Sequence, residues 1–595
     1  MKALKALVPY LRRYRLSIAL GLLAVVGANG VAALSLEAIK HGVDALSEPG
    51  ATRNTVARWA AISVGLALLT GLGRFWMREI LNGTSRRVEA DLRDDFFAHL
   101  LTLDASFYAR HPTGEIMSRA TNDIQAVRMV AGPAYMYLVN TLVFGVIAVV
   151  RMAWIDPWMT FISLVPMLLL PPVTVGFGRI IHDRFTRIQE QIGLLSTMAQ
   201  ENLAGQRIVK AYGQEAPQSA RFRELSAEAM RRNVELARTS GLFYPSLGLL
   251  AGLAMAVALL VGGRAILAGR ITIGDFVLFV LYLGQLAWPM IALGWVTNLF
   301  QRGAASMARV SEVLEAEPRV RDAPDAAAPD PVRGEIEFRG VSFRYPGADR
   351  DVLRDISFHV PAGSTVAVVG PTGSGKSTLV SLLARLFDPT AGTVTVDGVP
   401  ADRWPLARLR RVVALVPQDT FLFSASIEEN LALGFDDADP ASRLARVRAA
   451  AAVARLDETV SEFPGGYSTV LGERGINLSG GQKQRAALAR AVARDAPILV
   501  LDDALSAVDT HTEHEILDGL KQVFAGRTSV IVSHRVAAVM DADLILVLDD
   551  GRLAERGTHA ELLRAGGLYA ALQRRQMLEA QVEGDDLLAA ASGGV

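Results

Sequence analysis

Six long apolar runs fill the first half of the chain and constrain its fold more than any other feature. They lie near Leu16–Ala38, Val56–Ile80, Ala134–Trp154, Trp158–Ile180, Tyr244–Ala268 and Ile273–Phe300. As a helix, each run is long enough to cross about 30 Å of hydrocarbon. Buried helices of a large soluble protein are the alternative. However, 51% of the residues are hydrophobic and the mean hydropathy is +0.28, which favours membrane segments. The sequence therefore predicts an all-α transmembrane domain with six spans.

The links between the runs alternate in length. The links after the first, third and fifth runs are short. Those after the second and fourth are long, have the periodicity of amphipathic helices and extend the spans beyond the bilayer. The long links leave on the side that carries Arg12, Arg13, Arg15, Arg74, Arg78, Arg86 and Arg87. Because basic residues mark the cytoplasmic side, we expect a multi-pass protein of the cell (inner) membrane whose N-terminus and second half are cytoplasmic. The basic N-terminus precedes a first span rather than a cleaved signal peptide.

Several residues inside the apolar runs are unusual for a membrane helix. Three prolines in the fourth run, Pro166, Pro171 and Pro172, must bend or break its hydrogen-bond ladder. Polar residues within or near the runs are Asn29, Asn140, Gln285, Asn298 and Arg151. We expect the amides to bond between helices and Arg151 to reach the interface. A water-filled substrate path is the alternative, and the sequence assigns it to no particular residue.

The composition excludes some function classes. Lys and Arg together number 61, as do Asp and Glu, so no net charge supports nucleic-acid binding. Cysteine is absent, which excludes disulfides, thiolate metal sites and cysteine nucleophiles.

The second half of the chain has the pattern of an α/β domain. A proline-containing segment, Glu315–Arg333, is typical of a linker. Strand-like runs follow at Glu335–Phe343, Thr365–Val369, Thr393–Val396, Val412–Val416, Ile498–Leu501, Ser529–Val532 and Leu544–Leu548. Because helical segments alternate with them, we expect a layered, largely parallel sheet. The predicted organisation is a transmembrane domain at 1–314, a linker at 315–333, an α/β domain at 334–580 and a flexible tail at 581–595.

A phosphate-binding loop identifies the ligand of this domain. The expected strand Thr365–Val369 leads directly into a glycine-rich turn and then into an apolar helix, which is the structural context that such a loop requires. The residues predicted to bind the nucleotide here are Gly370, Thr372, Gly373, Ser374, Gly375, Lys376, Ser377 and Thr378. The glycines direct backbone amides at phosphates, Lys376 reaches the β- and γ-phosphates, and Ser377 ligates Mg²⁺.

Further candidates lie at the ends of other strands. Asp502 ends the apolar run Ile498–Leu501 and is expected to hold Mg²⁺ or its water. Gln418 is a candidate for contacts with the metal and the attacking water, and His534 for contact with the γ-phosphate. Tyr345 is a candidate for stacking on adenine, although an aromatic residue near a strand end is more often part of the core. Asp503 occupies the position of a general base.

In their order along the chain, these motifs resemble the ATPase domain of ABC transporters. The resemblance rests on Gly370–Thr378, Gln418, Leu478-Ser-Gly-Gly-Gln482, Ile498–Asp503, Ser506-Ala-Val-Asp509 and His534. Upstream, Leu92–Leu101 and Thr113–Asp123 resemble the first intracellular loop of the type IV exporters, and Glu201–Tyr212 resembles the second. Thr469–Gly475, which contains Glu473, resembles the exporter segment that touches the coupling helices. The fold implied is a six-helix transmembrane domain with long intracellular helical extensions, followed by an α/β P-loop nucleotide-binding domain.

The resemblance implies a dimer with shared ATP sites. One chain carries one ATPase domain and is therefore a half-transporter. The partner-site residues, which would contact ATP held by the other subunit, are Ser479, Gly480, Gly481 and Gln482. The implied cofactors are ATP and Mg²⁺. The implied partners are a second half-transporter, membrane lipid and a small hydrophobic substrate, with no nucleic acid.

The chain departs from the family pattern at Asp503, where the family places glutamate. Aspartate is one methylene shorter, so its carboxylate is withdrawn by about 1 Å or more and hydrolysis at this site should be weak. The intact Leu478–Gln482 favours a heterodimer whose partner supplies the glutamate, whereas the retained His534 leaves a homodimer open. We expect an exporter subunit that moves drugs or lipids out of the cytoplasm. The alternatives are a homodimeric lipid flippase and an ATP-gated channel or sensor.

Overall fold

The computed structural model describes residues 2–47, 52–435, 437, 439–472, 475 and 477–578. The chain forms two compact units. The first, here called the membrane unit, contains Met1–Leu101 and Thr113–Ala316. The second, the ATPase unit, contains Thr102–Pro112 and the chain from Glu317 onward. The predicted tail at 581–595 and Glu473 of the predicted coupling segment lie outside the described residues.

The membrane unit is entirely helical in its described part. Its elements are η1 (Lys2–Leu7), α1 (Val8–Arg13), α2 (Arg15–Ser47), α3 (Arg53–Leu100), α5 (Thr113–Ser118), η2 (Arg119–Asp123), α6 (Ile124–Met129), η3 (Val130–Ala134), α7 (Tyr135–Ile155), α8 (Pro157–Leu168), α9 (Leu170–Ala204), α10 (Gln206–Ala211), α11 (Glu215–Leu267) and α12 (Ile273–Leu314). Among the described residues, 6 helices are long and apolar enough to cross a membrane. The predicted six spans are confirmed.

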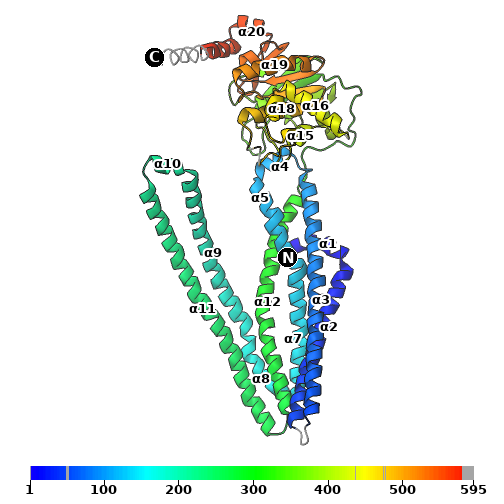
Figure 1. Ribbon diagram of the computed structural model, residues 1–595, viewed down its shortest axis with the longest axis vertical. Coiled ribbons are helices and arrows are strands. Elements are labelled where there is room, and N and C mark those ends of the chain that lie inside the picture. Colours follow the sequence, from blue (N-terminus) through cyan, green and yellow to red (C-terminus); the bar gives the residue numbers. More distant parts are fainter. Residues whose placement is uncertain are drawn as a thin grey trace. The chain divides into compact units, whose positions relative to one another are not determined.

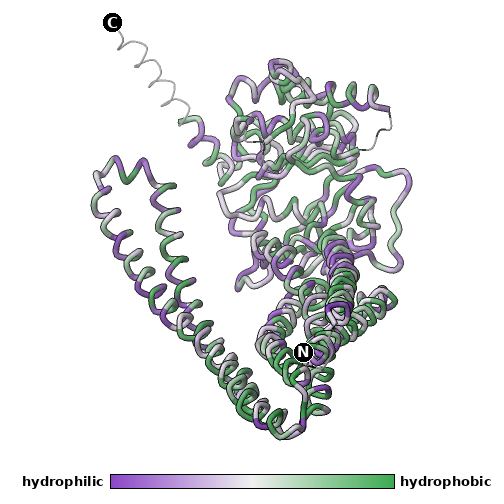
Figure 2. Tube along the Cα trace, turned by 60° about the horizontal axis from the view of Figure 1, so that its bottom comes forward, coloured by the Kyte–Doolittle hydropathy of each residue, from purple (hydrophilic) through white to green (hydrophobic). Residues whose placement is uncertain are grey.

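Local sequence signals start several of these helices. The Thr52 hydroxyl caps α3 by accepting a hydrogen bond from the Thr55 amide at 3.3 Å. Thr272 and Asp275 form a capping box at the start of α12. The long links continue the span helices instead of forming separate elements, so α11 alone runs for 53 residues. Helices α9 and α11 lie side by side, are joined by α10 at their tip and diverge from α12 toward that tip (Figure 1). Hydrophobic residues dominate the opposite, span ends of these two helices (Figure 2).

The residues singled out inside the spans behave in different ways. The helix is interrupted at Leu169, between α8 and α9, as the prolines predict. The amide of Asn29 donates to Asn140 at 2.9 Å, which confirms a hydrogen bond between α2 and α7. The guanidinium of Arg151 forms an ion pair with Glu37 of α2. The expectation that this side chain reaches the interface stays a prediction.

The ATPase unit contains two sheets rather than one. Its strands are β1 (Ile336–Phe343), β2 (Leu353–Val360), β3 (Thr365–Val369), β4 (Ala391–Val396), β5 (Val399–Pro400), β6 (Val413–Val416), β7 (Ile498–Asp502), β8 (Thr528–Val532), β9 (Leu544–Asp549) and β10 (Arg552–Gly557). A 6-stranded sheet has the order β10-β9-β3-β8-β7-β6 and is parallel except for β10. A 4-stranded antiparallel sheet has the order β2-β1-β4-β5. The single-sheet expectation is therefore corrected, since the runs predicted at Glu335–Phe343 and Thr393–Val396 form the second sheet.

Helices complete the layers of the ATPase unit. They are α4 (Ala105–Arg110), α13 (Lys376–Leu383), α14 (Leu406–Val412), α15 (Ile427–Ala432), α16 (Pro440–Val453), α17 (Asp457–Ser461), α18 (Gly480–Arg494), α19 (Thr510–Phe524) and α20 (His559–Ala565), with short 3-10 turns at Ala401–Arg403, Gly466–Ser468 and Val536–Ala538. Residues of the central strands alternate between two cores. Val500 faces the antiparallel sheet and α13, whereas Leu499 faces α16, α18 and α19. Both faces of the parallel sheet are covered, so all residues of β7 and β8 are buried.

Strand register brings the candidate site together. Val532 pairs with Asp502 on one side and with Val368 on the other. The carboxyl ends of β3, β7 and β8 therefore meet at one edge, and β6 joins them through the pair Val416–Leu501. Ligands of open α/β sheets bind outside this edge.

The segment 317–333 is held against the ATPase unit. Arg403 forms an ion pair with Asp325, and the Leu406 amide donates to Asp322 at 2.6 Å. The buried Arg385 donates to the Arg321 carbonyl at 2.8 Å. A linker rich in proline and alanine is thus ordered by charged residues of the domain that follows it. The segment Thr102–Pro112, which the predicted boundary assigned to the first domain, also groups with this unit.

Candidate functional site

The phosphate loop lies between β3 and α13, as the sequence predicts. The Lys376 ammonium turns back into the loop and donates to the carbonyls of Gly370 at 3.0 Å and Pro371 at 2.8 Å. The Ser377 hydroxyl donates to Asp502 at 3.0 Å. This bond joins the two expected Mg²⁺ ligands of the loop and of β7.

Two glycines of the loop are required by close contacts. Gly370 has a φ of 151°, and a Cβ there would lie 2.1 Å from the Leu548 carbonyl oxygen. Gly375 has a φ of 99°, and a Cβ there would lie 2.7 Å from Leu353 Cδ2. The loop therefore cannot carry side chains at these positions without moving β2 or β9.

Burial perturbs both charged groups at the base of the loop. Asp502 is 5% exposed and Lys376 is 6% exposed. Burial raises the pKa of Asp502, opposed by its hydrogen bond from Ser377. Burial lowers the pKa of Lys376, opposed by the carboxylates of Asp503 and Asp502. Each charged form is thus held in a poorly solvated site, where a bound divalent cation would stabilise the Asp502 carboxylate and phosphate oxygens would stabilise the Lys376 ammonium.

One cavity of about 200 Å³ gathers most of the predicted site residues. It is lined by Val352, Thr372, Gly373, Gly375, Lys376, Ser377, Thr378, Gln418, Asp502, Asp503, Val532 and His534. Ser374 belongs to the loop itself, and its buried hydroxyl has no hydrogen-bond partner among the described residues. Gly370 shapes the loop from behind. The residues thus come from the ends of four parallel strands, as a nucleotide site of this fold requires.

Tyr345 lies at the side of this cavity and not among its lining residues. Its hydroxyl is 3.0 Å from the Thr378 hydroxyl, and its ring packs edge-on against Phe343 and Phe387. The ring is therefore fixed by the core of the antiparallel sheet, at the end of β1.

Asp503 follows β7 and has an uncommon backbone conformation. Its φ is 49°, in the left-handed region that aspartate adopts more readily than glutamate. Its amide donates to the Val532 carbonyl at 2.9 Å, which fixes the turn against β8. The side chain also borders a second cavity of about 150 Å³, together with Glu513 and His534.

His534 lies on a loop that other side chains hold at two points. Gln576, in the helical residues 568–578, donates to the His534 carbonyl and accepts from the Val536 amide at 2.8 Å. Arg535 forms an ion pair with Glu513 of α19. Burial raises the pKa of Glu513, opposed by Arg535. No local sequence pattern relates Gln576, Glu513 or Arg535 to His534, so these residues become apparent only in the folded chain.

The predicted partner-site residues lie at the start of α18, apart from the ATP cavity of the same chain. Ser479 and Gln482 form a capping box, in which the Ser479 amide donates to Gln482 at 2.8 Å. Gly481 lies close to the loop Ser506–Asp509, since a Cβ on it would be 2.8 Å from the Ala507 carbonyl oxygen. The amides of Gly480 and Gly481 are thus at a helix N-terminus, which favours anions.

Gln484 connects this helix to the loop that contains Asp503 and was not among the predicted site residues. Its side chain donates to the Ser506 hydroxyl at 2.8 Å and accepts from the Ala507 amide at 2.8 Å. The Ser506 hydroxyl in turn donates to the Asp503 carbonyl at 3.1 Å. Gln484 lies two residues after the signature motif, and its glutamine amide near the start of a basic helix is the signal that the sequence offers.

These residues fit MgATP. The fit rests on the glycine cradle at Gly370 and Gly375, the unpaired Ser374 hydroxyl, and the oxygen ligands of Ser377 and Asp502 with Gln418 on the same cavity wall. Hard oxygen ligands beside a phosphate site suit Mg²⁺.

Comparison with known proteins identifies the family. The family model of the ABC transporter transmembrane region matches residues 18–290, and that of the ABC transporter matches residues 353–506. A Bacillus subtilis (strain 168) protein described as a probable multidrug resistance ABC transporter ATP-binding/permease protein, YheI, is 37% identical over 98% of this chain and 99% of its own. The multidrug resistance-like ATP-binding protein MdlA of Escherichia coli (strain K12) is 36% identical over 91% of each chain. The ATP-dependent lipid A-core flippase of Chromohalobacter salexigens is 35% identical over 97% of this chain and 98% of its own.

A solved structure agrees with these relatives. A bacterial Atm1-family ABC exporter with ATP bound superposes with a TM-score of 0.78 at 31% sequence identity, over 94% of this chain and 98% of that chain. The predicted fold class, ATP and Mg²⁺ dependence and membrane location are confirmed at the level of the family. The chain therefore belongs to the ABC transporters of the exporter fold, as a multi-pass inner-membrane protein whose cytoplasmic ATPase domain couples ATP hydrolysis to transport.

Proposed function

We propose that this chain is one subunit of a heterodimeric exporter that moves hydrophobic or amphipathic compounds out of the cytoplasm by alternating access. The observation that carries the proposal is the ATP cavity, which combines a complete phosphate loop, Gln418 and His534 with aspartate at position 503. The site is equipped to hold MgATP, whereas its general base is short. Transport requires a second site with a longer base, and the intact start of α18 is suited to complete that site in the partner.

The individual roles follow from this arrangement. Lys376 binds the β- and γ-phosphates, while Ser377, Gln418 and Asp502 hold Mg²⁺ directly or through water. Asp503 and His534 act at the γ-phosphate, and Tyr345 lies beside adenine. Ser479, Gly480, Gly481 and Gln482 contact ATP held by the partner subunit. The multidrug relatives from Bacillus subtilis and Escherichia coli support drug-like substrates.

Vesicle transport tests this function. The full transporter is reconstituted in vesicles and supplied with ATP and a hydrophobic fluorescent dye, Hoechst 33342. ATP-dependent accumulation that vanadate abolishes supports a pump. Passive dye flux opened by a non-hydrolysable ATP analogue contradicts it and supports the ATP-gated channel. The matched control is Lys376→Ala, which removes the phosphate contact and must abolish accumulation.

A homodimeric lipid flippase is the second candidate, and the 35% identity to a lipid A-core flippase favours it. The chain expressed alone distinguishes the two. A stable dimer of this chain that flips fluorescent phospholipid with ATP supports the flippase. A chain that assembles and turns over ATP only with a second half-transporter supports the heterodimer.

A further inference from the structure

Polar side chains connect two segments of the chain that are far apart in sequence. One is the first intracellular loop, which comprises the end of α3, α4, α5 and η2. The other, here called the α12 tail, comprises Gln301–Glu312 and the first linker residues to Val320. Their contacts occur both within the membrane unit and, separately, within the ATPase unit.

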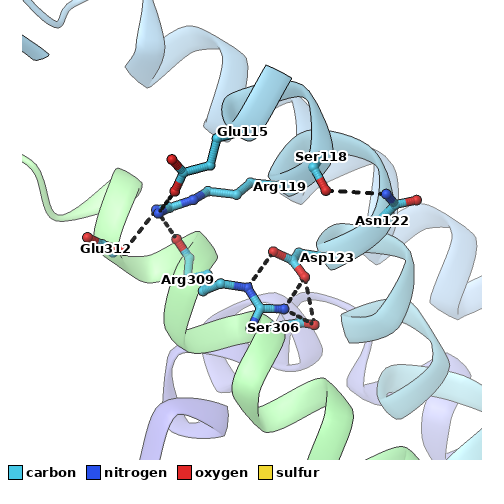
Figure 3. Close-up of polar contacts among 8 residues, drawn as sticks. All are labelled: Glu115, Ser118, Arg119, Asn122, Asp123, Ser306, Arg309 and Glu312. Carbon is cyan, nitrogen blue, oxygen red and sulfur yellow. Dashed lines mark hydrogen bonds and ion pairs between the residues drawn. The ribbon is translucent and has the colours of Figure 1, made fainter. Parts of the chain in front are cut away.

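Asp123 carries the contact in the membrane unit. It is 8% exposed and accepts two hydrogen bonds from Arg309, one at 2.8 Å and one at 2.5 Å. The Ser306 hydroxyl donates to the same carboxylate at 2.9 Å. Figure 3 shows Asp123 of η2 pointing at both residues of α12. A bidentate pair of this kind, between a buried carboxylate and a half-exposed guanidinium, fixes geometry as well as supplying attraction.

Arg119 forms a second contact one turn away. Its side chain is 8% exposed and donates to Glu312 at 2.8 Å, to the Arg309 carbonyl at 3.1 Å and to Glu115 at 2.5 Å (Figure 3). Two positions of η2, about one turn apart, are therefore joined to two successive turns of α12. Such a double contact resists both sliding and rotation of one helix along the other.

Asp104 carries the contact in the ATPase unit. Its Oδ2 accepts from the amides of Arg319 at 3.1 Å and Val320 at 3.3 Å. Its Oδ1 caps α4 by accepting from the Phe107 amide at 3.3 Å, and it also accepts from the Ser106 hydroxyl at 2.8 Å. One buried carboxylate therefore holds the start of α4 and the linker together.

The second intracellular loop is built differently. Gln191 of α9 donates to the Leu225 carbonyl of α11 at 3.1 Å, and Arg232 of α11 donates to the Arg187 carbonyl of α9 at 2.8 Å. These contacts close a hairpin of α9 and α11. The first loop is instead joined to the α12 tail, which leads directly into the ATPase domain.

We propose that Asp123 and Asp104 are positioning residues that join the first intracellular loop to the α12 tail, so that ATP-driven movement reaches the spans through these two segments as one lever. This inference rests on the alternating access proposed above. Loss of either carboxylate leaves ATP binding intact and uncouples it from the movement of the spans.

Spin-label distances test the lever, because the chain has no cysteine to interfere. Labels are placed at Gln189→Cys of α9 and Arg302→Cys of α12, both exposed positions, in full-length chain assembled with unlabelled, cysteine-free partner subunits in nanodiscs. ATP with vanadate is expected to shorten the label distance in the parent protein. Asp123→Ala is expected to reduce the shortened population about three- to thirtyfold, with the KM for ATP unchanged within about twofold.

Three further variants separate a lever from a local packing defect. Arg309→Ala and the double variant with Asp123→Ala should show the same loss as Asp123→Ala alone, because one contact is removed in each case. Asp104→Ser keeps a capping hydroxyl for α4 but is too short for the linker amides, and should show a comparable loss. The matched control is Asp183→Ala, at an exposed position of α9.

The outcomes distinguish the two proposals. A full distance change in Asp123→Ala, or a double variant whose loss is the product of the single losses, overturns the lever. No ATP-dependent distance change in the parent protein overturns alternating access, and the lever with it. The melting temperature of every variant identifies samples that have unfolded. In that case the milder Arg309→Lys tests the lever, because it keeps the charge and one hydrogen bond to Asp123. This variant should retain most of the ATP-dependent distance change.

Discussion

The length of the side chain at position 503 is expected to limit hydrolysis at this chain's own ATP site. Asp503 lies at the end of β7 and borders both the ATP cavity and the smaller cavity beside His534. Substitution by glutamate extends the carboxylate by one methylene, about 1 Å or more, toward the phosphate loop. A positioned general base contributes about 10² to 10⁴ in rate, so a partial recovery of about tenfold or more, equivalent to about 1.4 kcal/mol of barrier, is expected for Asp503→Glu.

The same change has a stability cost that the backbone sets. Asp503 has a φ of 49°, where the left-handed conformation costs about 1–2 kcal/mol for an ordinary L-residue and less for aspartate. Glutamate is therefore expected to destabilise the ATPase domain by about 1 kcal/mol and to lower its melting temperature by about 2–4 °C. Asp503→Glu is therefore expected to combine faster ATP hydrolysis with a lower melting temperature.

Single-turnover phosphate release measures the effect. The assembled transporter is held in excess over radiolabelled ATP in nanodiscs. A heterodimer should show a fast phase from the partner's site and a slow phase from this chain's site. Asp503→Glu should accelerate the slow phase, and Asp503→Asn should change it by less than about threefold. The reasoning is refuted if Asp503→Asn abolishes turnover while ATP binding is intact, because Asp503 would then already be an effective base.

Three other substitutions probe the site. Gly375→Ala combines a φ of 99° with a 2.7 Å contact to Leu353, whereas the Cβ of Gly373→Ala meets nothing within 4 Å; the first should abolish binding of a fluorescent ATP analogue and the second should weaken it less. Burial raises the pKa of Asp502, so the native protein retains this proton to a higher pH than the unfolded chain and loses stability as pH rises through that pKa. Asp502→Asn should therefore raise the melting temperature of nucleotide-free protein at neutral pH while abolishing Mg²⁺-dependent hydrolysis, and equal melting temperatures would contradict this. Gln484→Leu removes the two hydrogen bonds of the buried Gln484 side chain and should cost about 1–3 kcal/mol in urea unfolding and reduce turnover. If only the shape of this side chain matters, Gln484→Glu should not reduce turnover.

The sequence by itself determined the parts that depend on local pattern. Six apolar runs dictate six spans because a lipid-exposed backbone must satisfy its own hydrogen bonds. The strand and glycine turn before Lys376 dictate a phosphate loop because the required backbone conformations are available to glycine. Asp502 follows from the apolar strand that carries it. In each case the residues that decide the structure are neighbours in the chain.

The tertiary structure decided everything that joins distant residues. The runs at β1 and β4 look like strands of a parallel sheet, yet they pair with each other. Strand β2, whose residues alternate in burial, pairs with the other side of β1, so that these strands form a separate antiparallel sheet. The sequence shows only that the side chain at position 503 is short. The left-handed backbone conformation of Asp503 is found only in the folded chain, in the turn where its amide bonds to β8.

The polar contacts of the first intracellular loop show the same division most clearly. Asp123 and Arg309 are 186 positions apart, and Asp104 and Val320 are 216 apart. In the sequence alone, each of these aspartates looks like a solvated charge on an amphipathic helix or in a loop. Packing of η2 against α12, and of the linker against the start of α4, removes water from both aspartates and supplies their donors. Whether a charged residue faces solvent or joins two segments is a property of burial, which no local pattern encodes.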